Sequence, residues 1–149
     1  MATLTLEVFS RFQSATDANK LLYTPINDRL TYNHTRLYTI ECEGDVDAAR
    51  DYMRRVLVDT ISQKVQEDGT PALSGELFCI SYGIKKGALD LEKEAILTNY
   101  NGRKGLPFTI NSLTITQNIY VFGQGDKEGL SSRFCKDICN PAIHTWSVR

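Results

Sequence analysis

Four cysteines and two histidines are the residues of this chain whose chemistry could serve catalysis or metal binding. Cys135 and Cys139 lie one helical turn apart in a segment with helical periodicity, so they share one face of a predicted helix. A zinc site needs four ligands, or three and a water, and His144 is the single further ligand nearby in sequence. We therefore interpret the two cysteines as buried core thiols, and expect neither a metal nor a cofactor.

The other candidate nucleophiles lack a visible base. Cys42 and Cys79 fall in segments with strand character, where packing in the core is the default. A cysteine nucleophile needs a base beside it, and nothing in the sequence brings His34 or His144 to either cysteine. His144 follows the end of a predicted helix and is interpreted as a surface or capping residue. Nucleotide-binding and hydrolase motifs are also missing. We expect no catalytic residues in this chain.

Two further features are candidate contacts with a partner. The basic, glycine-containing segment Asn101–Gly105 could hold a phosphate through backbone N–H groups with Arg103 or Lys104. A plain β-turn explains the same residues, since Asn-Gly is a strong turn former. Trp146 is either the last core contact or an anchor for a partner protein, because tryptophans are enriched at binding hot spots.

Composition and charge limit the classes of protein to which this chain can belong. Basic and acidic residues number 17 and 18 in 149 residues, and 42% of the chain is hydrophobic. The net charge of −1 gives no electrostatic reason to bind nucleic acid or an anionic membrane. The start of the chain lacks the features of a secretory signal, and no apolar run approaches the ~20 residues of a membrane span. We expect a cytoplasmic protein with an ordinary apolar core.

Hydrophobic periodicity and turn signals predict mixed helices and strands. Strands are expected at Thr3–Phe9, Leu37–Cys42, Gln63–Gln66, Leu77–Gly83, Phe108–Phe122 and Ile143–Val148. Helices are expected at Val46–Val58 after an Asp45 N-cap, from the Asp90 N-cap through Leu97, and at Lys127–Cys139, with a short one at Asp17–Tyr23. Helices and strands are interspersed, and we expect an α+β fold.

The second half of the chain repeats the pattern of the first. Leu37–Ile40 and Val56–Ile61 correspond to Ile119–Phe122 and Ile138–Ala142, at an offset of roughly 81 or 82 residues, which is the length of a duplicated small domain. We predict a first half at residues 1–67, a linker at 68–75 and a second half at 76–149. Each half would be an antiparallel sheet with two helices, and the two would pair as a pseudo-dimer that closes their open apolar faces.

Four short motifs resemble one family, the PurS-type small subunit of phosphoribosylformylglycinamidine synthase and the duplicated PurS-like region that opens some longer synthase chains. Tyr82–Ile96 is similar to the segment K-P-G-V-x-D-P-x-G-x-A-I, with Gly87 and Asp90 at its glycine and aspartate. Asn140-Pro141-Ala-Ile-His resembles N-P-V-I-E. In the first half, Leu37–Glu41 resembles V-Y-T-I-E and contains Tyr38, and Leu57–Gln63 resembles T-D-P-V-I-Q and contains Asp59.

The resemblance implies a structural role. The full enzyme hydrolyses glutamine in one subunit and passes ammonia to an ATP-dependent synthetase centre, and the small subunit bridges the two. The expected partners are thus the glutaminase and synthetase subunits or domains of the same enzyme, with a homo-oligomer as a further possibility. A different class of protein is the alternative: a ferredoxin-like module that binds or senses a small ligand unrelated to purines. A small enzyme using Cys or His ranks third.

Overall fold

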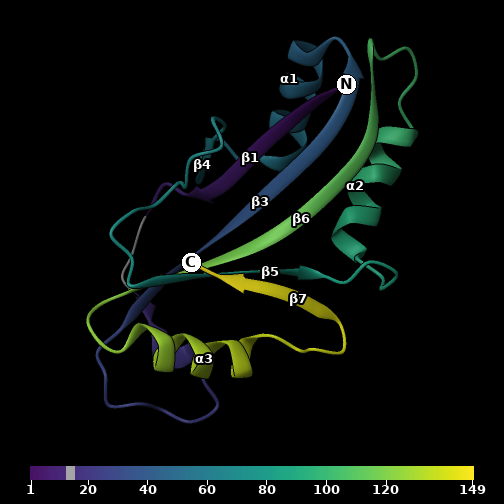
Figure 1. Cartoon of the computed structure of the whole chain (residues 1–149). Helices are drawn as coiled ribbons and strands as arrows, with labels where there is room; N and C mark the ends of the chain where they lie inside the picture. The colour runs from purple at the N-terminus through teal and green to yellow at the C-terminus, as the bar shows by residue number, and fades with distance from the viewer. Residues whose placement is uncertain (13–15) are drawn as a thin grey trace. The chain divides into compact units, whose positions relative to one another are not determined.

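The computed structural model describes residues 1–12 and 16–149, and it has an α+β fold with a seven-stranded sheet (Figure 1). The strands are β1 (Ala2–Ser10), β2 (Thr16–Asp17), β3 (Thr31–Gly44), β4 (Gln63–Gln66), β5 (Phe78–Ile84), β6 (Phe108–Phe122) and β7 (His144–Val148). The helices are the 3-10 turn η1 (Ala18–Leu21), α1 (Val46–Leu57), α2 (Leu91–Asn101) and α3 (Lys127–Ile138). The strands follow the order β4-β1-β3-β6-β5-β7, and β2 pairs with β3.

The predicted α+β class and most predicted elements are confirmed. β4 and β6 have the predicted bounds, and α1 and α3 end one residue before the predicted ends. The helix predicted at Asp17–Tyr23 is only the single turn η1. Its cap residue Leu22 is already extended, with φ −109° and ψ 144°, and Pro25 follows, whose ring disfavours a helical residue before it.

The chain forms two compact units, each built from three segments. Unit 1 comprises residues 1–11, 36–72 and 89–115, and unit 2 comprises residues 12–35, 73–88 and 116–149. Each unit therefore takes segments from both of the predicted halves. The halves at 1–67 and 76–149 are a statement about a sequence repeat, and they stay a prediction.

Unit 1 has its core on one face of its strands. Side chains alternate across a strand, and Leu4 and Leu6 of β1 with Ile40 of β3 point to the same side and are at most 6% exposed. Met53 of α1 and Ile96 of α2 pack against that face in the same apolar cluster. Each such buried aliphatic side chain stabilises the fold by about 1.5–3 kcal/mol. The two helices thus cover one face and leave the other to polar residues of the strands.

Unit 2 has a separate core. Phe78 of β5 and Val121 of β6 pack with Phe134 of α3, and all three are 0% exposed. The Phe78 and Phe134 rings lie 5.7 Å apart in a tilted arrangement, which is a favourable geometry for an aromatic pair. Ala18 of η1 joins the same cluster. Helix α3 therefore covers β5 and β6 as α1 covers β1 and β3.

Candidate functional site

The motif residue Asp59 organises the turn that follows α1. Its Oδ1 accepts the N–H of Ile61 at 3.1 Å, and its own N–H donates to Oε1 of Gln63 at 2.9 Å. Its carbonyl accepts the N–H groups of Ser62 and Gln63. Hydrogen bonds from the Ser62 hydroxyl and the Ile61 N–H lower the pKa of the Asp59 carboxyl. Asp59 thus stabilises the backbone of the turn that leads into β4.

Asn140 makes the corresponding turn after α3. Its Oδ1 accepts the N–H of Ala142 at 2.9 Å, and its own N–H donates to Nδ1 of His144 at 3.0 Å. Its carbonyl accepts the N–H groups of Ile143 and His144. Pro141 is exposed inside this turn, where its fixed φ is favourable. His144 is half-buried at the start of β7, and its contact is with this turn.

Gly87 and Asp90 each shape the backbone, in unit 2 and unit 1 respectively. Gly87 has φ +93°, a value that favours glycine, in a turn closed by the Ala88 N–H on the Lys85 carbonyl at 3.0 Å. Asp90 caps α2, because its Oδ1 accepts the N–H of Lys93 at 3.1 Å. The predicted N-cap is confirmed.

Tyr38 is a buried residue in a partly exposed hydrogen-bonded cluster that holds α2 on β3. The Tyr38 hydroxyl donates to Oε1 of Glu92 at 2.8 Å, and an Arg36 N–H donates to the same oxygen at 3.2 Å. Burial, followed by the Glu92 carboxylate, raises the pKa of Tyr38 to about 12. The tyrosine is 3% exposed and stays protonated at neutral pH, so this cluster fixes a helix rather than a reacting group.

The thiols are placed for packing. All four cysteines are buried and none forms a disulfide. Burial raises the pKa of Cys135, and it raises the pKa of Cys139 to about 11 with a further contribution from Cys135. Thiolates are the nucleophilic and metal-binding form, so these shifts of the pKa lower the thiolate fraction of both cysteines at neutral pH. In the described part of the chain, no group of three or more Cys, His, Asp or Glu residues could hold a metal ion.

The two predicted partner contacts lie on the surface of different units. Arg103 and Lys104 are exposed after α2, where the Arg103 N–H donates to the Tyr100 carbonyl at 3.0 Å in a turn. Trp146 is 42% exposed on β7, opposite Tyr82 of β5. Together with Ile143 and Val148, Trp146 gives unit 2 a set of accessible apolar side chains around its last strand.

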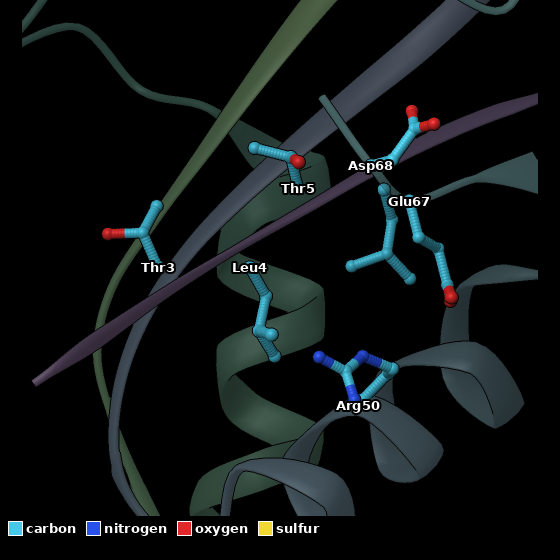
Figure 2. A pocket seen from close by; sticks show the side chains of 7 residues that line it. Thr3, Leu4, Thr5, Arg50, Glu67 and Asp68 are labelled. Atoms are coloured by element: carbon cyan, nitrogen blue, oxygen red, sulfur yellow. The ribbon is translucent and has the colours of Figure 1, made fainter. Parts of the chain in front are cut away.

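A small cavity lies beside β1 in unit 1, and no sequence pattern indicates it (Figure 2). It has a volume of about 220 Å³ and is lined by Thr3, Leu4, Thr5, Leu6, Arg50, Glu67 and Asp68. Side chains of consecutive strand residues point to opposite faces, so a cavity that touches four in a row lies along the strand's edge. Figure 2 shows Thr3 and Thr5 on one side of β1, with Leu4 on the side of Arg50.

The charges around this cavity are mostly paired. Arg50 donates to Asp47 at 2.9 Å, and Glu67 accepts two hydrogen bonds from Arg54. The bonds from Arg54 lower the pKa of the Glu67 carboxyl. Asp68 instead accepts from neutral groups of Gln66 and Thr70, and these bonds lower its pKa. Asp68 is therefore an ionised, exposed carboxylate without a cationic partner in the described residues.

Comparisons of the chain with protein-family models, with curated proteins and with solved structures find no significant match. In the part of the chain that the structure describes, no helix has the length and apolar character needed to cross a membrane.

Proposed function

We propose that this chain is a non-catalytic structural subunit or domain of phosphoribosylformylglycinamidine synthase, bridging its glutaminase and its ATP-dependent synthetase. The motif residues that carry the resemblance support this role. Asp59, Asn140 and Gly87 shape turns, Asp90 caps a helix, and Tyr38 holds α2 to β3. A set of residues that fixes backbone geometry suits a scaffold better than an active site.

The single observation that carries the proposal is the recurrence of one set of contacts in both units. Helix α1 begins at Val46 and α3 at Lys127, 81 residues later, and β4 begins at Gln63 and β7 at His144, again 81 residues later. The N-cap residues of α1 and α3 have nearly the same backbone angles, φ −75° and ψ 98° against φ −76° and ψ 103°. The turns at Asp59 and Asn140 have the same spacing.

The strand pairing repeats with the same register. Leu4 lies opposite Ile40, and Phe78 lies opposite Val121. Leu6 lies opposite Tyr38 in the first sheet, as Ile80 lies opposite Ile119 in the second. Agreement of helix bounds, turns and register supports a tandem duplication of one small unit, with the linker at 68–75 between the two copies.

Duplication suits a bridging protein for a physical reason. Two copies fused in one chain form a pair without the entropic cost of association, because each is always at high effective concentration near the other. The copies can then diverge, so that one contacts the glutaminase and the other the synthetase. Their surfaces already differ: unit 2 has Trp146 exposed on its last strand, and unit 1 has the charged cavity beside β1.

The alternative function, a small-ligand-binding or regulatory module, finds less support. The cavity of about 220 Å³ is smaller than the ~300–1,000 Å³ typical of ligand pockets, and three of its seven lining residues are charged. A ligand that raised the melting temperature of the isolated chain would favour this alternative, because binding to the folded state alone stabilises it.

Binding to the two proposed partners tests the scaffold role. The purified chain is mixed with the glutaminase and the synthetase of the same organism, and complexes are measured by analytical ultracentrifugation. We expect one assembly that contains all three proteins. Trp146→Ala should weaken it, whereas Tyr23→Ala, which removes another exposed aromatic of unit 2, should not. A chain that sediments alone in the presence of both proteins contradicts the proposal.

A further inference from the structure

The edge of β1 that faces β4 is covered along only part of its length. β4 pairs with residues Glu7 to Ser10 of β1, and its last residue, Gln66, lies opposite Glu7. β1 itself begins at Ala2, and β3 pairs with its other edge from Ala2 to Val8. In the described chain no strand therefore lies opposite Thr3 to Leu6 on the β4 side. The cavity of about 220 Å³ occupies this place.

The backbone groups of Thr3 and Thr5 point to this open edge. Just after β1, the Arg11 N–H donates to the Ser62 carbonyl at 2.8 Å, on the β4 side. The N–H and C=O groups of a strand alternate between its two edges with a period of two residues. Thr3 and Thr5, at even separations from Arg11, therefore direct their donors and acceptors toward the cavity, whereas Leu4 and Leu6 direct theirs toward β3.

In unit 2, the corresponding edge is that of β5, and it is paired along this part by β7 and Arg149. Cys79 of β5 corresponds in register to Thr5, since Cys79 lies opposite Tyr120 and Thr5 lies opposite Thr39. Cys79 donates its N–H to the Arg149 carbonyl at 3.0 Å and accepts the Arg149 N–H at 3.1 Å. The chain after β7 thus continues the ladder where the chain after β4 leaves it.

The two units differ in the residues that come directly after each edge strand. Counted from Gln63 and His144, the residue that corresponds to Arg149 is Asp68. The chain turns at Asp68, whose carboxylate accepts hydrogen bonds from the side chains of Gln66 and Thr70. The preceding residue, Glu67, accepts a hydrogen bond from Arg54 of α1. The β1–β4 ladder therefore ends at Gln66, and Asp68 does not take the place opposite Thr5 that Arg149 takes opposite Cys79. The chain after Asp68 contacts side chains of β1 instead: Gly69 lies near the Thr5 hydroxyl, and the Ala72 N–H donates to Oε1 of Glu7 at 3.0 Å.

We propose that the open edge of β1 from Thr3 to Leu6 binds an extended segment of a partner protein, which adds to the sheet antiparallel to β1 and places a Lys or Arg side chain at Asp68. An exposed edge is a ready template for strand addition, in which main-chain hydrogen bonds provide affinity and side-chain contacts provide specificity. The filled edge in unit 2 shows the kind of occupant: an extended backbone whose residue opposite Cys79 is an arginine. The inference does not depend on the enzyme proposed above.

The charge of the lining favours a basic side chain. Arg50 and Glu67 already form ion pairs within the chain. Asp68 is hydrogen-bonded to a neutral group, so among the lining residues its carboxylate is the charge that a basic side chain of the partner could pair with. An ion pair at this exposed carboxylate mainly selects the partner and its register, because surface pairs contribute little affinity.

Amide hydrogen exchange on a tethered strand tests the proposal. The residue types of β7 and its continuation are fused before Met1 in the order Arg-Trp-Ser-Val-Thr, through an Asn-Gly turn, which places them antiparallel to β1 at high effective concentration with the arginine opposite Thr5. β3 occupies the other edge of β1, so the tether can pair only with the open edge. The matched control replaces its Ser and Thr by Pro, which removes two of the backbone donors that face β1.

In the unmodified chain, the Thr5 amide should exchange at least about tenfold faster than those of Leu4 and Leu6, which face β3. The tether should slow Thr5 exchange by about tenfold or more and leave Leu4 and Leu6 unchanged, and the Pro-containing tether should have no effect. A Thr5 amide as protected as Leu6 in the unmodified monomer, or unaffected by the tether, overturns the proposal. Protection that appears only when the chain sediments as a dimer also overturns it, because a second copy is then the occupant.

Discussion

The Oδ1 atoms of Asp59 and Asn140, in two different units, accept the same hydrogen bond from the backbone N–H two residues later. Each residue also donates its own N–H to a side chain four residues on, Gln63 in one case and His144 in the other. The two turns therefore have the same structural role: each connects a helix to an edge strand.

The equivalence of the two turns predicts that Asn140 tolerates aspartate. Asn140→Asp keeps the acceptor for the Ala142 N–H and should change the free energy of unfolding by less than about 0.5 kcal/mol, whereas Asn140→Ala should cost about 0.5–1.5 kcal/mol. Urea denaturation measures both. Asp59→Asn is the reciprocal control. A loss for Asn140→Asp as large as that for Asn140→Ala would show that the two turns are not equivalent.

The Tyr38 cluster predicts loss of stability in alkali. The folded pKa of about 12 lies above the ordinary value of 10.0, so this group's contribution is complete below about pH 10 and is lost as the pH rises through 12. Thermal unfolding measured across this range should show a steeper decline for the wild type than for Tyr38→Phe. Glu92→Gln removes the carboxylate charge and should lower the pKa of Tyr38 in a tyrosinate absorbance titration. An unchanged pKa would contradict the described contact.

The buried thiols predict slow reaction with a thiol reagent. All four cysteines are buried, and burial raises the pKa of Cys135 and Cys139, so native protein at pH 7.5–8 should react far more slowly than protein in denaturant. Ellman's reagent counts the accessible thiols in each state. Rapid modification of a native thiol would reopen the assignment of a cysteine nucleophile.

Gly44 is predicted to be intolerant of a side chain. It has φ +96°, and an added Cβ would lie 2.6 Å from the Pro107 carbonyl oxygen. Gly44→Ala should therefore cost about 1–3 kcal/mol of unfolding free energy. Gly102→Ala is the matched control, because Gly102 has φ −75° and its nearest neighbour would be at 3.5 Å. Equal stability of the two variants would contradict the close approach at Gly44.

The sequence predicts the elements whose signals are local. Fifteen residues of alternating β-formers define β6 at Phe108–Phe122, and the Asp45 and Asp90 caps mark the first residues of α1 and α2. The hydrogen bond between Tyr38 and Glu92 joins residues 54 positions apart, so no local sequence pattern predicts it. The open edge of β1 depends on where β4 ends, and the turn-forming run after Gln66 is its only sequence signal.

The central claim is that the chain links two catalytic proteins without reacting itself. Purified glutaminase and synthetase, assayed with and without the chain, test it when either glutamine or ammonia is the nitrogen source. We predict that synthesis from glutamine requires the chain, whereas synthesis from ammonia proceeds without it. Equal glutamine-dependent turnover in its presence and absence would contradict the bridging role.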